Sequence, residues 1–143
     1  MGRDGDAEGM LRSAASVVSG DAGIHHALGL TLVRLKRLDE AIAELRRAAQ
    51  LDPDQPRYSY VYGVALHSAG SKSEGLAVLK ESLAHHPSDR DLLRALVSFS
   101  RDDGDAAAAL GYAQQLARIA PSDPSVARLI QDLQRQGKEP AAR

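Results

Sequence analysis

Apolar and small residues recur along the chain at the spacing of a helix face. A step of four residues followed by a step of three brings such positions into line on one side of an α-helix. Three sets follow this spacing at an interval of 34 residues: Ala41, Leu45 and Ala48; Gly75, Leu79 and Ser82; and Ala109, Ala113 and Leu116. The pattern predicts three similar helices, each with a small residue that lets a second helix approach closely.

Positions ahead of each set repeat at the same interval and predict that second helix. The matching places are Leu28-Gly29, Tyr62-Gly63 and Leu96-Val97. Each unit closes with Pro53, Pro87 or Pro121, because the residue before a proline is disfavoured in helical geometry. Pro56 and Pro124 suit the first position of a following helix. The chain is therefore predicted to be a series of helix pairs.

A short turn joins the two helices of each pair. Gly70 and Gly104 stand where a helix can end in left-handed backbone geometry, which glycine adopts without strain. Lys36 stands at the equivalent place in the first unit. We therefore expect a strained or different turn at Lys36.

The stretch HHALGLTLVRLKRLDEAIAELRRAAQLDPD, residues 25–54, carries a leucine-glycine pair, an alanine in the second helix and a closing proline. These features and the period of 34 residues resemble the tetratricopeptide repeat (TPR) family. The resemblance implies an all-α fold, an α-solenoid with a right-handed superhelix. It would contain three helix-turn-helix TPR repeats, at 22–55, 56–89 and 90–123.

The repeats depart from the family pattern at several places. Gly75 stands where alanine is usual, and Val97 replaces a small residue, so the third helix pair is expected to sit slightly apart. The large aromatic residue that often opens the first helix is replaced by His25, Ser59 and Leu93. None of these changes breaks the register.

The residues outside the repeats are expected to form two end helices. Ala7, Leu11 and Ala14 continue the register backwards and follow helical spacing. The expected segments are a disordered start at 1–5, an N-terminal half-repeat or capping helix at 6–19, a C-terminal capping helix at 124–137 and a disordered tail at 138–143. A piece of a longer repeat protein would show the same N-terminal half-repeat.

In the TPR family the first helices of successive repeats line a concave groove, so the resemblance implies a ligand groove. Its candidate residues are His26, Leu30, Val33 and Arg34 from repeat one, Arg57, Tyr60, Val64 and His67 from repeat two, and Asp91, Arg94, Ser98 and Arg101 from repeat three. Arg128 and Arg135 of the terminal helix are candidates for the same surface. This mixture favours a peptide with acidic and apolar side chains. The alternative is a set of ordinary solvent-facing positions.

Residues 58–64, with the sequence YSYVYGV, hold three of the five aromatic residues and alternate like a strand. The repeat register instead places them on a helix. We expect Tyr62 in the core, Tyr60 in the groove and Tyr58 near the preceding repeat, although Tyr60 could equally fill the seam between repeats.

Some TPR domains hold the C-terminal carboxylate of heat-shock chaperones with a clamp of lysine and asparagine residues. The matching places here are His26, Leu30, Val61, Asp91 and Ala95. None of them is Lys or Asn, so binding of a chaperone tail by that clamp is not expected.

Composition excludes several other chemistries. The net charge is −1, which provides no field for nucleic acid, and the lack of cysteine excludes thiolate zinc sites and c-type haem attachment. No apolar run approaches the roughly 20 residues that span a bilayer, so membrane insertion is not expected. Side chains in the pairs His25-His26 and His85-His86 point about 100° apart on a helix, so no metal or other cofactor is predicted.

The chain contains no phosphate-binding loop, nucleophile elbow or plausible catalytic triad, so it is predicted not to be an enzyme. We expect a protein-interaction scaffold that binds a partner peptide or protein segment in the groove. One alternative is a self-assembling TPR module. Another is an accessory TPR domain of a larger bacterial enzyme, such as a multihaem cytochrome or glycosyltransferase, since residues 57–70 and 89–105 look similar to TPR regions of bacterial multihaem cytochromes.

The start of the chain has no signal-peptide pattern, which favours a cytoplasmic location. A periplasmic location is the alternative if the chain is a fragment of a longer protein.

Overall fold

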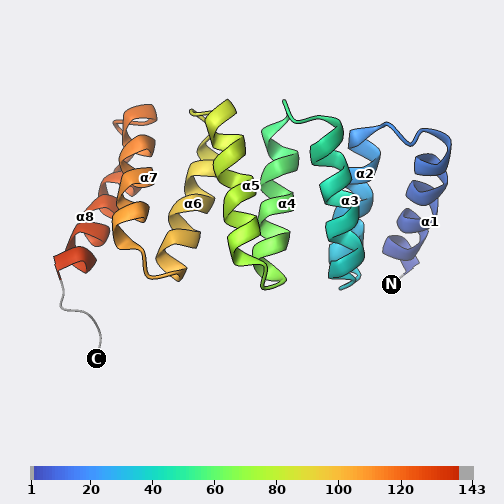
Figure 1. Cartoon of the computed structure of the whole chain (residues 1–143), viewed down its shortest axis with the longest axis horizontal. Helices are drawn as coiled ribbons and strands as arrows, with labels where there is room; N and C mark the ends of the chain where they lie inside the picture. The colour runs from blue at the N-terminus through green and yellow to red at the C-terminus, as the bar shows by residue number, and fades with distance from the viewer. Residues whose placement is uncertain (1, 139–143) are drawn as a thin grey trace. The chain divides into compact units, whose positions relative to one another are not determined.

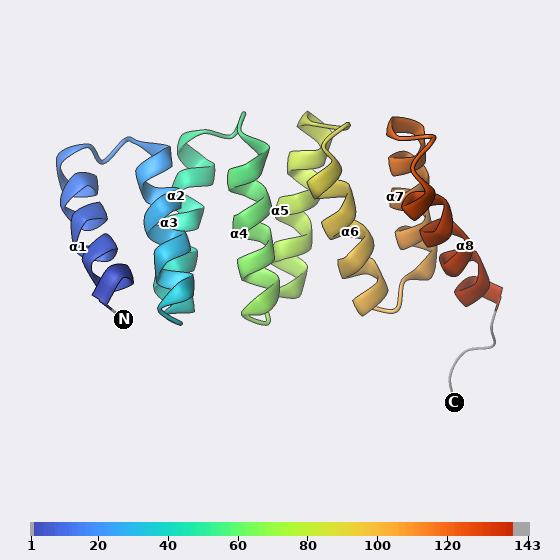
Figure 2. The same ribbon diagram turned by 180° about the vertical axis from the view of Figure 1, so that it is seen from behind.

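The computed structural model describes residues 2–138, and this part of the chain contains eight α-helices and no strand (Figures 1 and 2). The helices are α1 (Gly2–Val17), α2 (Ala22–Arg34), α3 (Leu38–Leu51), α4 (Pro56–Ser68), α5 (Lys72–His85), α6 (Arg90–Asp102), α7 (Ala106–Ile119) and α8 (Pro124–Lys138). The predicted all-α fold is confirmed. Residues 58–64 lie inside α4 rather than in a strand.

The helices belong to two compact units, Met1–His85 with α1 to α5 and His86–Arg143 with α6 to α8. Within the first unit, α1 packs against α2, α2 against α3, α3 against α4, and α4 against α5. Within the second unit, α6 packs against α7, and α7 against α8. Helices α2 to α8 thus bury apolar residues against their neighbours along the chain, as in a repeat fold.

Alternate helices begin at the interval that the sequence predicts. The first residues of α2, α4, α6 and α8 are Ala22, Pro56, Arg90 and Pro124. An aspartate precedes three of these helices and accepts a backbone N–H at its start: Asp21 from Ile24 at 3.1 Å, Asp89 from Leu92 at 2.9 Å and Asp123 from Ser125 at 2.9 Å. Helix starts are therefore determined by local chemistry.

The core of each unit follows the seams between its helices. In the first unit two clusters are Leu28, Leu32 and Ala41, with Leu11 packed on them, and Ile42, Leu45, Tyr62, Ala65 and Leu66. Buried apolar residues of the second unit include Leu96, Val97, Ala109, Ala113, Leu116 and Leu133. The prediction that Tyr62 lies in the core is confirmed.

The turn between the helices of each pair has left-handed backbone geometry. Gly70 and Gly104 have φ angles of 91° and 78°, and Lys36 has a φ angle of 60° at the equivalent place. The backbone N–H of Arg37 donates to the carbonyl of Leu32 at 2.9 Å and closes the turn, as in the glycine turns. Lys36 therefore adopts the strained alternative, because its Cβ crowds the backbone in this region.

The end helices differ in extent from the expected segments. Helix α1 begins at Gly2 and ends at Val17, so residues 2–5 are helical where a disordered start was expected. Helix α8 continues to Lys138, one residue into the expected tail. Residue 1 and residues 139–143, which complete the two expected disordered segments, lie outside the described residues.

Candidate functional site

The predicted groove positions are divided between the two units, and their surroundings differ. Within the first unit, Val33, Arg34 and Arg57 are exposed, Leu30, Tyr60, Val64 and His67 are half-buried, and His26 is buried. Within the second unit, Asp91, Arg94, Ser98 and Arg101 are all exposed. The candidate positions of the second unit are therefore the more accessible.

His26 differs most from the expectation that it lines a groove. Its side chain lies beneath Tyr58, with the ring centroids 4.7 Å apart, and only 8% of the residue is exposed. Neither ring nitrogen has a hydrogen-bond partner among the described residues. Burial, with a smaller contribution from the charge of Arg57, lowers the pKa of His26. His26 is thus part of the α2–α4 seam, and the contact confirms that Tyr58 lies near the preceding repeat.

Arg34 is exposed but already engaged within its unit. Its Nε donates to Asp4 at 3.2 Å, and its terminal nitrogen donates to the hydroxyl of Thr31 at 3.1 Å. The guanidinium therefore joins α2 to α1, and these contacts compete with any external acid.

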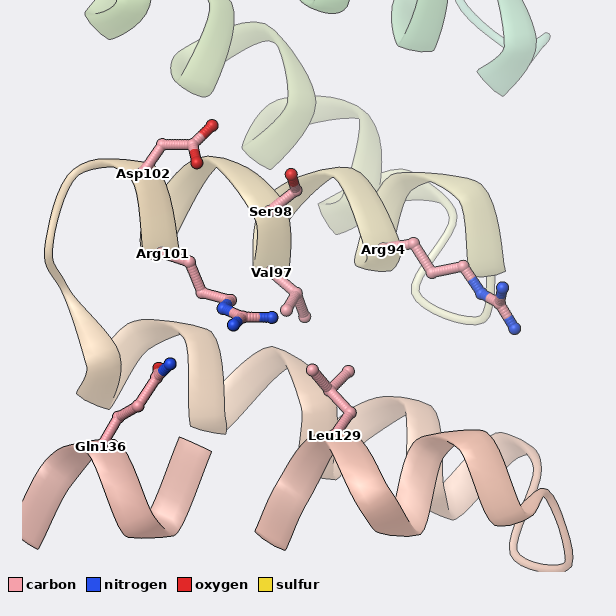
Figure 3. Close-up of a pocket in the computed structure, with 7 residues that line it drawn as sticks. All are labelled: Arg94, Val97, Ser98, Arg101, Asp102, Leu129 and Gln136. Carbon is pink, nitrogen blue, oxygen red and sulfur yellow. The ribbon is translucent and has the colours of Figure 1, made fainter. Parts of the chain in front are cut away.

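The second unit contains a pocket of about 530 Å³ between α6 and α8 (Figure 3). Its lining residues are Arg94, Val97, Ser98, Arg101, Asp102, Leu129 and Gln136. Arg101, Val97 and Leu129 are directed into the space between the two helices, whereas Ser98 and Asp102 project from the other side of α6. A cationic group and two apolar side chains thus share one open pocket.

The two arginines of this pocket are not equivalent. Arg94 lies 3.8 Å from Asp123, in the turn before α8. The hydroxyl and backbone N–H of Ser125, followed by the charge of Arg94, lower the pKa of Asp123. Arg101 has no ion pair with any residue between positions 2 and 138. Arg101 is therefore the cation of this pocket that is available to an external acid.

Three of the four predicted positions of the third repeat line the pocket, and Asp91 does not. The candidates Arg128 and Arg135 on α8 do not line it either, because the next residues, Leu129 and Gln136, take that place. Neighbouring residues of a helix point about 100° apart, so the residues of α8 that line the pocket could be identified only once the orientation of α8 against α6 was known. Leu129 and Gln136 are seven residues apart, which places both on one face of a helix, and this spacing was the sequence signal that could have identified them.

Two further pockets were not predicted. One, of about 270 Å³ in the first unit, is lined by Ala49, Gln50, Pro53, Ser59, Tyr62, Val78, Glu81, Ser82 and His85. The other, of about 440 Å³ in the second unit, is lined by Ala106, Ala107, Leu110, Leu133, Gln134, Gly137 and Lys138.

Metal-binding side chains do not converge in the described part of the chain: no group of three or more His, Cys, Asp or Glu residues is placed to hold an ion. The ring nitrogens of His25 lie 2.6 Å from a carboxylate oxygen of Glu44 and 2.8 Å from the carbonyl of Ser19. His25 therefore joins α2 to α3. Of the helices described, none has both the length and the apolar character needed to cross a membrane.

The sequence model of the tetratricopeptide repeat family matches residues 5–56, 26–84 and 72–124. The chain therefore belongs to the tetratricopeptide repeat family, and its fold is that of an all-α TPR solenoid. TPR proteins are in general scaffolds for protein interaction rather than enzymes.

Solved TPR structures share this fold. A crystal structure of MamA matches with a TM-score of 0.78 and 18% identity over 93% of this chain and 80% of that chain. MamA from Desulfovibrio magneticus RS-1 matches with a TM-score of 0.72 and 16% identity over 97% of this chain and 88% of that chain. PilF of Pseudomonas aeruginosa matches with a TM-score of 0.79 and 24% identity over 96% of this chain and 63% of that chain. Among curated proteins, none matches the sequence significantly.

Proposed function

We propose that this TPR module binds a partner peptide or protein segment that carries acidic and apolar side chains. The pocket between α6 and α8 is the principal contact site. The chain contributes binding and has no catalytic activity of its own. The observation that carries the proposal is the position of Arg101, an unpaired cation among the described residues, beside two apolar side chains.

The chemistry of the pocket supports this choice of ligand. An aspartate or glutamate of the partner would form a charge-assisted hydrogen bond with Arg101. An apolar side chain next to it would cover Leu129, which is half-buried. Arg94 is held towards Asp123, so it would contribute less to affinity. A segment with both kinds of side chain would thus satisfy both parts of the pocket.

The predicted positions of the first unit extend the proposal. Val33, Tyr60 and Val64 are apolar or aromatic and at least partly accessible, and Arg57 is exposed. We propose that they contact further residues of the same partner. Tyr60 is the strongest candidate anchor among them, because aromatic residues dominate many interfaces.

The test is an array of synthetic peptides in which acidic residues alternate with Leu and Phe, probed with the purified chain. We expect a subset to bind and Arg101→Glu to weaken that binding at least about tenfold. Arg128→Glu makes the same charge change on α8 outside the pocket and should preserve binding. Equal affinities for wild type and Arg101→Glu would remove the pocket from the proposal.

Self-assembly and the accessory-domain hypothesis remain as alternatives. Light scattering over a concentration series distinguishes a self-assembling module from a monomeric binder. A mass that rises with concentration, without any peptide binding, would favour self-assembly.

A further inference from the structure

The pocket of about 270 Å³ in the first unit lies where two helices end. Ala49 and Gln50 belong to the last turn of α3, Ser82 and His85 belong to the last turn of α5, and all four residues line the pocket. The carbonyl end of a helix carries a partial negative charge of about half an elementary charge, which favours a nearby cation. The position of the pocket in the fold therefore favours a positively charged ligand.

Pro53 leaves an unpaired acceptor in the wall of this pocket. Within a longer helix the carbonyl of Ala49 would accept from the backbone N–H of residue 53, but a proline has no N–H. The backbone N–H of Asp52 donates to Ala48 instead, and no turn N–H of the described residues donates to Ala49. Ala49 and Pro53 both line the pocket. The carbonyl of Ala49 is therefore an acceptor without a backbone donor.

Ser82 is a second unpaired group of the pocket. It is 5% exposed, and its hydroxyl has no hydrogen-bond partner among the described residues. Thr31 shows the usual alternative, since its hydroxyl donates to the carbonyl of Ala27 one turn earlier, at 2.9 Å. A buried hydroxyl without a partner lowers stability. The equivalent residue of α3 is Ala48, so the repeat packing does not require a hydroxyl here, and a ligand would supply the missing partner.

Glu81 contributes a full negative charge to the pocket. It is exposed, and it has no ion pair with any residue that the structure describes. The cation Arg46 is engaged elsewhere, because its Nε donates to the hydroxyl of Tyr62 at 2.9 Å and its terminal nitrogen lies 3.9 Å from Glu74. The place of Glu81 in α3 is taken by Arg47, so this charge is specific to the second repeat. The carboxylate of Glu81 is therefore available to an external cation.

The inner wall of the pocket is mainly apolar. Tyr62 is 7% exposed, and Ala49 and Val78 are half-buried. An alkyl stem can cover such side chains while its charged end reaches a carboxylate. The volume of about 270 Å³ is below the roughly 300–1,000 Å³ of pockets that hold drug-sized molecules. The pocket therefore has the size for a single side chain.

We infer that this pocket binds the side chain of a lysine from a partner protein, with the ammonium group at the carboxylate of Glu81. The other N–H groups of the ammonium donate to the hydroxyl of Ser82 and the carbonyl of Ala49. An ammonium has three rotatable donors for three such acceptors, whereas a guanidinium is a planar fork suited to one carboxylate or phosphate. The site shares no residue with the pocket that contains Arg101, so it does not depend on the proposed function.

The test is a titration of the whole chain, labelled with nitrogen-15, with the peptide acetyl-Gly-Gly-Lys-Gly-Gly-amide at pH 7.5. We expect saturable NMR shifts of the amides of residues 49–53, 59–62 and 78–85, with a dissociation constant on the order of 1 mM. A peptide with norleucine in place of lysine keeps the alkyl stem without the charge and should cause no saturable shift. Cadaverine, a free diamine, should bind no more tightly than the lysine peptide.

Variants of the chain test the role of each group in the same titration. Glu81→Gln should weaken binding of the lysine peptide about tenfold, because it removes the charge from the carboxylate. Glu74→Gln makes the same change two turns earlier on α5, outside the pocket, and should preserve binding. Ser82→Ala should weaken binding about threefold without lowering the melting temperature, since α3 has an alanine at the same place. A purely structural role of Ser82 would lower the melting temperature and leave binding unchanged.

Four outcomes would overturn the inference. They are equal binding of the norleucine and lysine peptides, unchanged affinity for Glu81→Gln, shifts confined to other residues, and cadaverine binding at least about tenfold more tightly than the lysine peptide. The last outcome would assign the pocket to a free amine. Arg101→Glu should leave binding of the lysine peptide unchanged, which separates this test from that of the proposed function.

Discussion

The helix pairs of the first unit and the α6–α7 pair of the second unit carry different residues at the same register positions. In α2–α3 and α4–α5 a glycine of the first helix faces a leucine of the second, Gly29 with Leu45 and Gly63 with Leu79. In α6–α7 the corresponding residues by register are Val97 and Ala113, and both are buried. The larger side chain has moved from the second helix to the first.

A valine with an alanine occupies about the same total volume as a glycine with a leucine, so the exchange keeps the summed side-chain volume at these two register positions. Cores tolerate substitution when the total volume is preserved. The sequence pattern alone suggested that Val97 would push its helices apart. Ala113 is smaller than Leu45 and Leu79, which stand at the equivalent places in the other two pairs. Four experiments test how the two units differ.

The largest effect is expected for Gly29→Val, which puts the side chain of the second unit into the first. The new Cβ would lie 2.6 Å from Leu45, so the free energy of unfolding should fall by about 3 kcal/mol. Urea denaturation followed by circular dichroism measures it. Adding Leu45→Ala should cost less than the sum of the two single changes, and strict additivity would argue against a shared volume.

The reverse change, Val97→Gly, should lower the free energy of unfolding by about 2 kcal/mol, because it leaves a cavity next to Ala113 and weakens the helix. The double variant with Ala113→Leu should recover part of the loss in the same urea experiment. Ala113→Leu alone should destabilise by overpacking. If it stabilised the protein, the third pair would be loosely packed.

A smaller effect is expected at the turns. Lys36→Gly should raise the free energy of unfolding by about 1 kcal/mol, because it relieves the left-handed backbone with a φ of 60°. Gly70→Ala makes the opposite change at the equivalent turn and should lower it by a similar amount. Thermal unfolding of both variants measures the two changes in stability. Shifts of the same sign would show that backbone conformation is not the cause.

The smallest effect is a pH dependence that His26 gives to the first unit. Burial lowers the pKa of His26, so the unfolded chain binds this proton more tightly than the folded chain. The contribution of His26 to stability is therefore complete above its unfolded pKa of about 6.5 and is lost as the pH falls below it. Urea midpoints between pH 7.5 and about 5 should fall more for wild type than for His26→Leu. Parallel curves would assign the pH dependence to other groups.

The helix pairs could be predicted from the sequence because their signals are local and repeated. The interval between Pro53, Pro87 and Pro121 identified the register, and the register corrected the strand-like pattern of residues 58–64. The strain at Lys36 was visible as a non-glycine residue at a glycine position. Each of these features depends on residues close together in the chain.

The candidate site could be predicted only in part. Register placed Arg94, Ser98 and Arg101 on one helix face, and the pocket contains all three. It did not show that Leu129 rather than Arg128 lines the pocket, or that Arg94 lies near Asp123. These depend on the rotation of α8 and on side-chain conformations, which the pattern of apolar positions specifies only to within about one residue.

The class of fold, the repeat length and the ends of most helices follow from the amino-acid sequence, because prolines, caps and apolar spacing act within one or two turns of the chain. Which side chains are accessible depends instead on the packing of the helices: His26 is buried beneath Tyr58, whereas Arg101 and Met10 are exposed. Accessibility depends on what packs against a residue from another helix. That contact is a property of the assembled helices and not of the local pattern.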